Sequence, residues 1–432
     1  MKCINQNIFP VTLKRNERGN LEIGGCDLTE LAMKHDTPLY VIDEQTLRGI
    51  LQEYKKAFAQ YENTKFLYAS KACLNLAIAK IVAGEGFGFD VVSGGEIYTV
   101  YKAGTDMSKV LFNGNNKSKE ELELALELGV GRISADNFHE LELLNKLAKD
   151  KVDILLRITP GIECHTHDYI KTGQLDSKFG FDMEQIDSAI GIIQNKYKNI
   201  KIKGLHAHVG SQIFETKVFD DEIDILLKEI ERIKTTFGLE LSEINIGGGI
   251  GVKYTEEDMP VSVFDVAKII TNKLKNTNLT LYLEPGRSII STSGVTLYEI
   301  GSSKTVELNK HKYVSINGGM ADNPRPSLYG AKYTAEIANN IQNKKTEKVT
   351  VAGKFCESGD ILINEIELPE PKAGDILCVY NTGAYNYSMS SNYNRIKKPE
   401  MVLVNNSQSD IIIERESYDD LISSDKIPER LK

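Results

Sequence analysis

Eight short apolar runs between about residues 65 and 285 constrain the fold of this chain more than any other feature. Each run ends in small or polar residues, and helical patterns with apolar residues at i, i+3, i+4 and i+7 separate most of them. Alternating strands and helices form parallel βαβ units, and eight such units close a barrel. We therefore predict an α/β protein with a (β/α)8 barrel over residues 44–290. The runs are KFLYASKA, FGFDVVSGGE, KVLFNGNNKS, GRISADN, VDILLRITPG, IKGLHAHVGSQ, EINIGGGIG and LTLYLEPGR.

The pattern changes after residue 290, where short β-rich segments follow one another with Gly, Pro and Asn turns between them. We predict a mainly β domain, barrel-like or sandwich-like, over residues 291–432. Residues 1–43 look extended and include LYVID, so we expect them to pack with this domain. A helix is expected from about Glu44. The length of 432 residues also favours two domains over one.

Composition excludes several classes of partner. The chain has 52 Lys+Arg against 61 Asp+Glu, so no basic excess is present to neutralise the phosphates of a nucleic acid. No apolar run approaches the ~20 residues of a membrane span, and the N-terminus lacks the apolar core of a signal peptide. The six cysteines are scattered without a CxxC pair, which fits a reducing cytoplasm.

Three features at predicted strand ends carry candidate chemistry, because reactive groups of such barrels lie at the C-terminal ends of the strands. Lys71 follows the first strand; a lysine in a partly apolar mouth can bond to a carbonyl carbon, although a solvated loop lysine is the plain alternative. The NIGGGIG segment, residues 245–251, suits a phosphate or is a glycine-rich turn. Glu284 could hold a heterocyclic nitrogen protonated or pair with Arg287. Asp90, Asn113, Arg157 and His208 also fall at strand ends.

Together, a lysine, a phosphate cradle and a glutamate in one barrel mouth suit pyridoxal phosphate, a cofactor that acts as an electron sink. A metal site is not expected. His206 and His208 are interpreted as pointing to opposite faces of one strand, and the group Cys164, His165 and His167 lacks a matching second pair. Cys356 stands beside acidic residues, which is compatible with a proton donor or with a structural role.

Motifs along nearly the whole chain resemble the fold-type-III pyridoxal-phosphate-dependent decarboxylases, in particular those that act on meso-2,6-diaminopimelate. The resemblance implies conversion of that substrate to L-lysine and carbon dioxide, the last step of lysine biosynthesis. It also implies a homodimer. The motifs are YASKA, SKFGF, HVGSQ, GGGIG, EPGR, RPSLYGA, CESGD and GAYNYSMSSNYN.

The resemblance further implies roles for individual residues. Lys71 would bind the cofactor covalently, His208 would stack on its ring, and Glu284 would pair with the ring nitrogen. Cys356 would return a proton to the substrate. The other cofactor contacts would be Asp90, Arg157, Ser211, Gly248, Gly249, Gly286, Arg287 and Tyr385.

A substrate with a second amino-acid head needs a cation for its distal carboxylate and an anion for its distal ammonium. The resemblance assigns the carboxylate to Arg287, Arg325 and Tyr329, and guanidinium suits that contact through paired hydrogen bonds. Glu357 would meet the distal ammonium, and Tyr385 would reach the substrate. Cys356 and Glu357 would act on the active site of the partner subunit.

Three alternatives remain at this point. A related decarboxylase of another amino acid or of carboxynorspermidine would leave Arg325 without a distal carboxylate. A cofactor-binding regulator without turnover would not need Lys71, Cys356 and Glu357 together. A racemase would use a tyrosine from the β domain and would not need the CESGD motif.

Overall fold

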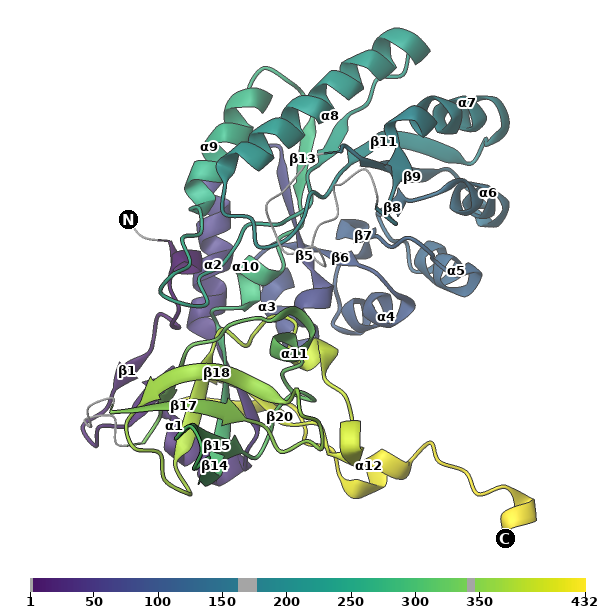
Figure 1. Cartoon of the computed structure of the whole chain (residues 1–432). Coiled ribbons are helices and arrows are strands. Elements are labelled where there is room, and N and C mark those ends of the chain that lie inside the picture. The colour runs from purple at the N-terminus through teal and green to yellow at the C-terminus, as the bar shows by residue number, and fades with distance from the viewer. Residues whose placement is uncertain (1–2, 162–176, 340–345) are drawn as a thin grey trace. The chain divides into compact units, whose positions relative to one another are not determined.

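Two compact units make up the chain in this computed structural model, which describes residues 3–161, 177–339 and 346–432 (Figure 1). The barrel unit comprises Met1–Asn7, Arg48–Lys253 and Glu257–Ile289. The β-unit comprises Ile8–Leu47, Tyr254–Glu256 and Ile290–Lys432. Each unit is described separately below.

Eight parallel strands close the barrel, which confirms the predicted fold of this unit. Neighbouring strands pair in chain order, and pairing of the eighth strand with the first and of the fourth with the fifth completes the ring. A short extra strand, β10 (Phe181–Asp182), pairs with β9. The barrel strands are β5 (Thr64–Ala69), β6 (Gly88–Val91), β7 (Val110–Phe112), β8 (Arg132–Ala135), β9 (Val152–Thr159), β11 (Ile200–His206), β12 (Glu243–Asn245) and β13 (Thr280–Leu283).

Helices surround these strands, as Figure 1 shows for α4 to α9. They bury apolar stripes against the sheet, while the strands are buried on both faces and therefore read as continuous apolar runs. The helices are α2 (Glu44–Ala57), α3 (Leu76–Gly84), α4 (Gly94–Lys102), α5 (Lys119–Glu127), α6 (Phe138–Leu147), α7 (Ile186–Lys196), α8 (Thr216–Phe237), α9 (Val263–Leu274) and α10 (Arg287–Ile290). Helix α2 begins where the sequence predicts it.

Polar N-caps set where five of these helices begin. In each, a side-chain oxygen accepts a hydrogen bond from a backbone N–H of the first turn, which would otherwise lack a partner. The capping residues are Asn75, Ser93, Ser118, Asn137 and Ser262. Four of these caps lie in the loops after β5 to β8, so they help to fix the rim that carries the candidate site.

The barrel interior is filled by side chains rather than open. Leu67, Leu111 and Leu155 come from the first, third and fifth strands and pack together, with Tyr282 against them. Such layers from alternate strands are the usual filling of a (β/α)8 barrel. The site therefore sits on a packed floor.

The main sheet of the β-unit is mixed, and one of its internal strands comes from the N-terminal part of the chain. Strand β4 (Leu39–Asp43) lies between β14 (Gly294–Thr305) and β20 (Glu400–Asn405), antiparallel to the first and parallel to the second. All five residues of β4 are buried. The prediction of a mainly β domain is confirmed. The other strands are β15 (Lys312–Ile316), β16 (Ala335–Ile337), β17 (Glu347–Ala352), β18 (Ile361–Leu368), β19 (Ile376–Tyr380) and β21 (Gln408–Ile413).

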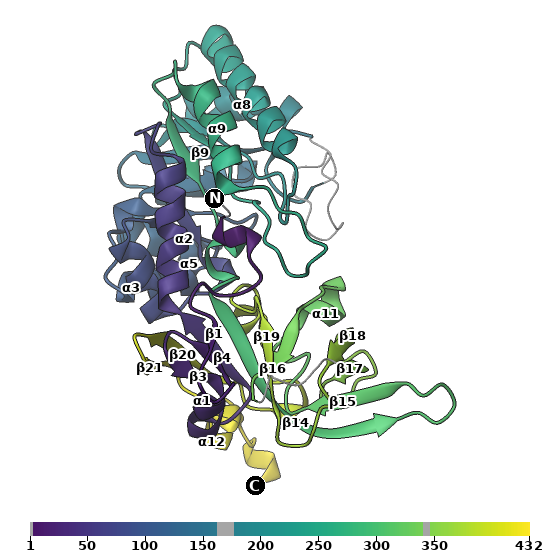
Figure 2. The ribbon, with the colours of Figure 1, turned by 90° about the vertical axis from the view of Figure 1, so that its left-hand side faces the viewer.

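The two halves of strand β14 pair with different strands of this sheet. Its first half pairs with β4 and β19, and its second half pairs with β15 as an antiparallel ribbon (Figure 2). The residues of β14 beyond Ile300 are exposed, which fits the ribbon that projects in Figure 2. Two short helices, α11 (Arg325–Tyr329) and α12 (Tyr418–Ile422), also belong to this unit.

The N-terminal segment differs from its prediction in two respects. Residues 3–7 belong to the barrel unit, because the Asn5 amide donates to the carbonyl oxygens of Gly251 and Val261 and Ile4 N–H donates to Glu53. The rest is not simply extended. It contains a small sheet of β1 (Lys14–Arg15), β2 (Leu21–Ile23) and β3 (Cys26–Asp27), followed by α1 (Leu28–His35).

No helix within the described ranges is long and apolar enough to cross a membrane.

Asp322 of the β-unit is deeply buried. Asp322 accepts from the Tyr298 hydroxyl at 2.5 Å and from Gly319 N–H at 3.0 Å. Burial raises the pKa of Asp322 to about 7; the Tyr298 hydrogen bond works against this rise, and the charge of Asp360 adds to it.

The raised pKa of Asp322 predicts a stability that falls with pH. The folded chain retains this proton to about pH 7, whereas an unfolded aspartate releases it near its model value of 3.8. Between these limits, the free energy of unfolding should fall by up to about 1.4 kcal/mol per pH unit. Asp322→Asn should remove this component, as urea midpoints followed by tyrosine fluorescence can measure. Asp419→Asn, at an exposed position, is the control, and an equal pH slope in all three proteins would contradict the prediction.

Candidate active site

Polar side chains gather at the C-terminal ends of the barrel strands, as the sequence predicts. Most of them are buried, although Lys71 is exposed. The group consists of Lys71, Asp90, Asn113, Ser134, Arg157, His206, His208, Asn245, Glu284 and Arg287.

Glu284, directly after β13, is the centre of this group. Its Oε1 accepts hydrogen bonds from the side-chain amides of Asn245 at 2.6 Å and Asn113 at 3.1 Å. Its Oε2 lies 3.3 Å from Nε2 of His206. Burial alone would raise the pKa of Glu284, but attraction to His206 and hydrogen bonds from His206 and Asn245 lower it below the model value of 4.5. Glu284 is therefore a buried carboxylate that stays ionised.

The pKa of Asp90, at the end of β6, shifts in the opposite direction to that of Glu284. Asp90 accepts from the Asn113 amide at 2.5 Å, so one asparagine bridges Asp90 and Glu284. Burial raises the pKa of Asp90 to about 7, and the negative charge of Glu284 adds to this rise. Two buried acids that share one amide thus hold different protonation states.

Lys71 belongs to the 3-10 turn Ser70–Ala72 that follows β5. Its positive charge lowers the pKa of both Asp90 and Glu284, which places the ammonium group near the two acids. It also contributes to the lowering of the pKa of His208, of which burial is the larger cause. The lysine therefore faces the same polar group and is not a remote loop residue.

The glycine loop after β12 lies tightly against neighbouring backbone. A Cβ on Gly248 would lie 2.3 Å from the Glu284 carbonyl oxygen, and one on Gly249 would lie 2.7 Å from the Gly210 carbonyl oxygen. Gly247 and Gly249 also have positive φ angles of 62° and 107°. Gly248 N–H donates to Nδ1 of His208 at 3.3 Å, which places the proton of a neutral His208 ring on Nε2. The segment is a close-packed cradle that only glycine can form.

Arg287 and Ser211 meet at the same rim. Nε and Nη2 of Arg287 lie 3.1 and 3.0 Å from the Ser211 hydroxyl oxygen. Gly286 precedes the arginine, and a Cβ there would lie 2.8 Å from the Ala69 side chain. A guanidinium, a hydroxyl and glycine backbone thus lie on neighbouring loops of the barrel unit.

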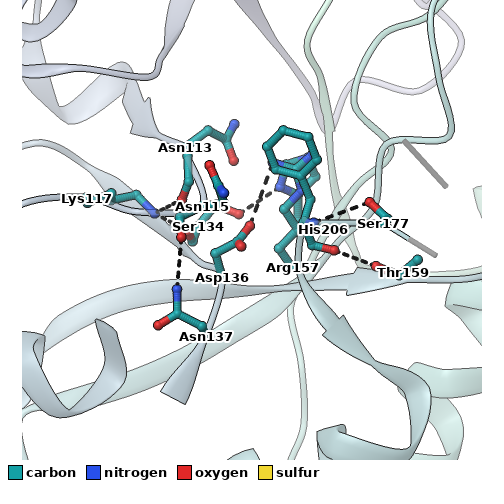
Figure 3. A network of polar contacts seen from close by, with 12 residues as sticks. Asn113, Asn115, Lys117, Ser134, Asp136, Asn137, Arg157, Thr159, Ser177 and His206 are labelled. Carbon is teal, nitrogen blue, oxygen red and sulfur yellow. Dashed lines mark hydrogen bonds and ion pairs between the residues drawn. The ribbon is translucent and has the colours of Figure 1, made fainter. Parts of the chain in front are cut away.

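Arg157, near the end of β9, lies beside an acid and an aromatic ring. Its Nη1 lies 3.9 Å from Oδ1 of Asp136, and its guanidinium lies 4.4 Å from the centre of the Phe179 ring. Figure 3 shows Arg157 and Asp136 directed toward one another. The structure therefore places Arg157 in a supporting network of the rim.

In the β-unit, Arg325 is held by two tyrosines. Its Nη1 donates to the hydroxyl of Tyr254 at 2.8 Å and to that of Tyr333 at 3.0 Å. Within the described residues, these are the hydrogen bonds of Arg325, and both come from Nη1. The Nε–Nη2 edge is thus the one that remains for a carboxylate. Tyr329 lies four residues later on α11, on the same side of that helix.

The CESGD segment of the β-unit forms a loop organised by its last residue. Carboxylate oxygens of Asp360 accept from the backbone N–H groups of Phe355 at 2.9 Å and Met320 at 2.7 Å. Cys356 and Glu357 are exposed. Gly359 accepts from the Ser327 hydroxyl at 2.9 Å, which ties this loop to α11.

Tyr385 adopts a left-handed backbone conformation, with φ 60°, in the loop after β19. A bulky residue in this region is uncommon and indicates a constrained position. Its side chain is half-buried. The structure assigns Tyr385, like Arg325, Tyr329, Cys356 and Glu357, to the β-unit.

His206 corrects one sequence interpretation. Residues two apart along a strand share a face. His206 is buried and His208 is half-buried, and the charge of Glu284 acts on both of them, so they are not on opposite faces. The sequence also missed Ser134, Asn245, Tyr254 and Tyr333 as site residues. Asn245 had a usable signal, since it ends a strand directly before the glycine loop. Cys164, His165 and His167 lie outside the described residues.

The barrel rim fits pyridoxal phosphate. The glycine cradle with Ser211 and Arg287 suits a phosphate, because backbone N–H groups, a hydroxyl and a guanidinium are its usual partners. Glu284 is an ionised acid that suits a protonated pyridine nitrogen. Lys71 supplies the amine for a covalent bond to the aldehyde.

Comparisons with known proteins agree with this chemistry. Residues 45–291 match the family model described as pyridoxal-dependent decarboxylase, pyridoxal binding domain. Diaminopimelate decarboxylase of Synechocystis sp. is 46% identical, covering 99% of this chain and 94% of that protein. The enzyme of the same name from Bacillus subtilis is 45% identical, covering 96% and 97%.

Solved structures give the same result for the fold. Diaminopimelate decarboxylase of M. jannaschii, solved in complex with L-lysine, superposes with a TM-score of 0.91 at 34% identity and covers 98% of this chain and 99% of its own. The Helicobacter pylori enzyme with L-lysine has a TM-score of 0.85 at 32% identity, covering 92% and 98%. A lysine/ornithine decarboxylase of Vibrio vulnificus, at 22% identity and TM-score 0.77 with coverage of 88% and 98%, shares the fold.

Proposed function

The chain belongs to the diaminopimelate decarboxylases, a family of pyridoxal-dependent decarboxylases, and we propose that it converts meso-2,6-diaminopimelate to L-lysine and carbon dioxide. Arg325 is the observation that carries the substrate. A buried guanidinium with one edge directed by two tyrosines suits a second carboxylate, which ornithine and lysine lack. The expected pathway is the last step of lysine biosynthesis.

The residues of the barrel rim have complementary tasks toward the cofactor. Bound pyridoxal phosphate supplies an electron sink for the pair left behind when carbon dioxide departs. Lys71 would provide the amine that holds the cofactor, and His208 would stack against its ring. Glu284 keeps a proton at the ring nitrogen, since its own carboxylate remains ionised.

The remaining cofactor residues anchor the phosphate or support the rim. Backbone N–H groups of the glycine loop and Gly286, with Ser211 and Arg287, suit the phosphate, and Tyr385 reaches the same region. Asp90 acts on Glu284 through Asn113, and Arg157 holds the rim through Asp136. The proposed phosphate residues are Ser211, Gly248, Gly249, Gly286, Arg287 and Tyr385.

The β-unit residues orient the substrate and complete the proton transfer. Arg325, with Arg287 and Tyr329, binds the distal carboxylate, while Glu357 binds the distal ammonium. The departing carboxylate must be replaced by a proton at the same carbon, and the Cys356 thiol donates it. Tyr385 completes the substrate contacts.

We propose a homodimer in which Cys356 and Glu357 act in the active site of the partner subunit. Both residues are exposed on the chain, which suits contact with a second subunit. Mixing equal amounts of Lys71→Ala and Cys356→Ala subunits tests this arrangement. Random exchange should restore about a quarter of wild-type activity, because one site in half of the dimers regains both groups. A mixture as inactive as its parents would contradict action in trans.

We also propose a reducing, cytoplasmic location. The five cysteines within the described ranges carry no disulfide, and Cys356 among them is exposed. A thiol that donates a proton must stay reduced.

The substrate proposal is tested by a panel of amino acids. The purified holoenzyme should release carbon dioxide from meso-diaminopimelate, and much less from ornithine, arginine or carboxynorspermidine. Release from one of these three but not from diaminopimelate would overturn the substrate. Failure of the chain to bind pyridoxal phosphate at all would overturn the activity.

Cys356→Ala should slow turnover without weakening cofactor binding. A lost proton donor lowers kcat by about 10²- to 10⁴-fold. Cofactor affinity, measured by titration of the apoenzyme, should stay unchanged. Cys378→Ala, at a buried position of the β-unit sheet, is the matched control and should retain kcat if the fold is kept. Equal losses of kcat in the two variants would contradict the assignment.

A further inference from the structure

His206 lies between a serine and the central carboxylate of the barrel rim. Its Nδ1 is 2.7 Å from the Ser134 hydroxyl oxygen, and its Nε2 is 3.3 Å from Oε2 of Glu284. Figure 3 shows Ser134 and His206 within the network of polar contacts at this rim. Both side chains are buried, with 0% and 1% exposure, so water does not compete for these contacts.

Ser134 is itself fixed in place. Its carbonyl oxygen accepts from the Lys117 ammonium at 2.7 Å, and Lys117 also donates to the Gly114 carbonyl and to Glu140, each at 2.8 Å. Figure 3 shows Lys117 reaching toward Ser134. The end of β8 is therefore held rigidly, and the serine hydroxyl faces the imidazole from a fixed position.

These neighbours favour one protonation state and one tautomer of the His206 ring. The groups whose charges act on His206 are Glu284, Arg157 and Lys71. Burial lowers the pKa of His206, and attraction to Glu284 only partly offsets this, so the ring is neutral and carries one N–H. An N–H at Nε2 faces the Glu284 carboxylate, whereas the other tautomer would direct a lone pair at it. The Ser134 hydroxyl then donates to Nδ1.

We propose that Ser134 and His206 form a positioning relay that holds Glu284 ionised and oriented toward the ring nitrogen of the bound cofactor. The relay deepens the proposed function and rests on it. Ser134 acts through His206, and His206 acts through Glu284.

The two oxygens of Glu284 have different neighbours, and the relay acts on Oε2. Oε1 already accepts from Asn113 and Asn245. Oε2 lies 3.3 Å from Nε2 of His206, and this buried nitrogen makes no hydrogen bond within the described residues. Without His206, Oε2 would lose the electrostatic attraction of this nearby N–H group, and protonation of the buried carboxylate would become easier.

A neutral imidazole also suits this role better than a charged one. An imidazolium would neutralise the carboxylate and weaken its attraction for a protonated ring nitrogen. A neutral N–H orients Oε2 and leaves the negative charge available. The low pKa that burial gives His206 therefore serves the same end as the low pKa of Glu284.

The test measures protonation of the cofactor ring directly. Holoenzyme is reconstituted with pyridoxal phosphate labelled with ¹⁵N in the ring, and the ¹⁵N shift is followed across the pH range of stability. In the wild type, the ring nitrogen should stay protonated. In His206→Phe, its apparent pKa should fall by at least about one unit. Turnover should drop about tenfold through kcat, with KM nearly unchanged.

A pair of conservative variants makes the relay separable from a packing defect. His206→Gln keeps an N–H donor on a side chain that does not tautomerise. The pKa of the cofactor ring nitrogen in this variant should therefore stay near that of the wild type. Ser134→Ala should lower the ring pKa in the wild-type background and have no further effect in the His206→Gln background. His139→Gln, at an exposed histidine of α6, is the control and should change nothing.

Two failures are distinguishable. If the wild type binds no pyridoxal phosphate, the proposed function is wrong. If the wild type binds it with a protonated ring, but folded His206→Phe titrates like the wild type, the relay is wrong. If His206→Phe does not fold, the effects of Ser134→Ala in the wild-type background and in the His206→Gln background decide. An equal effect of Ser134→Ala in both backgrounds, or none in either, would overturn the relay.

Discussion

Lys71→Ala should abolish covalent attachment of pyridoxal phosphate and turnover together. Lys71 is the lysine whose charge acts on Asp90, Glu284 and His208, so its amine is placed where the cofactor aldehyde must lie. Alanine has no amine to bond to the cofactor aldehyde, either when the cofactor first binds or when the product leaves it. We expect kcat to fall by roughly 10⁴-fold or more.

The measurement has two parts. Wild-type holoenzyme should show the visible band of a lysine-bound cofactor, and borohydride reduction followed by peptide mass spectrometry should find the cofactor on Lys71. In Lys71→Ala, the band and the labelled peptide should be absent. Lys80→Ala, at an exposed lysine of the following helix α3, is the control and should retain both. Persistence of the band in Lys71→Ala would remove Lys71 from its role.

Arg325→Gln should raise KM for meso-diaminopimelate by roughly 10²-fold, because it removes the positive partner of a buried carboxylate. Cofactor affinity should stay unchanged, since Arg325 belongs to the β-unit and its hydrogen bonds within the described residues go to Tyr254 and Tyr333, not to the glycine loop. Steady-state kinetics and cofactor titration measure the two quantities separately. Arg395→Gln, an exposed arginine paired with Asp425, should leave both unaltered.

The tyrosine partners refine this prediction. Tyr254→Phe and Tyr333→Phe remove one acceptor each from Nη1 and keep the rings that pack on the guanidinium. Each should raise KM less than Arg325→Gln does, by about tenfold at most. A loss of cofactor affinity as large as the loss of substrate affinity in Arg325→Gln would show that the arginine is structural.

Much of the fold was predictable because its signals are local. Each of the eight barrel strands lies within an apolar run, most of these runs alternate with helical patterns, and Glu44 marks the start of α2. Strands β1 and β16 escaped prediction because they have two and three residues and no regular alternation with helices marks their positions. Helix α1 was missed although Asp27 caps it and Leu28, Leu31 and Ala32 repeat at helical spacing.

The candidate site was predictable in part for the same reason. Lys71 and Glu284 follow strands whose ends meet at one rim, so strand order alone brings them together. The partners of Arg325 were not predictable this way. Tyr254 and Arg325 are separated by 71 positions in the chain, and only the folded β-unit shows that their side chains touch. His206 was misjudged through an error in strand geometry and not through lack of a signal.

The position of β4 has a consequence for synthesis on the ribosome. This strand emerges among the first 43 residues, yet its sheet neighbours β14 and β20 begin at Gly294 and Glu400. At about 5–20 residues per second, the nascent chain waits on the order of tens of seconds before β4 can pair. The barrel strands, which are consecutive, can assemble during that interval. A strand with four consecutive apolar residues, Leu39 to Ile42, that waits unpaired is a natural binding segment for a chaperone. Productive folding of this chain should therefore depend on protection of residues 39–43 until β14 and β20 have been synthesised.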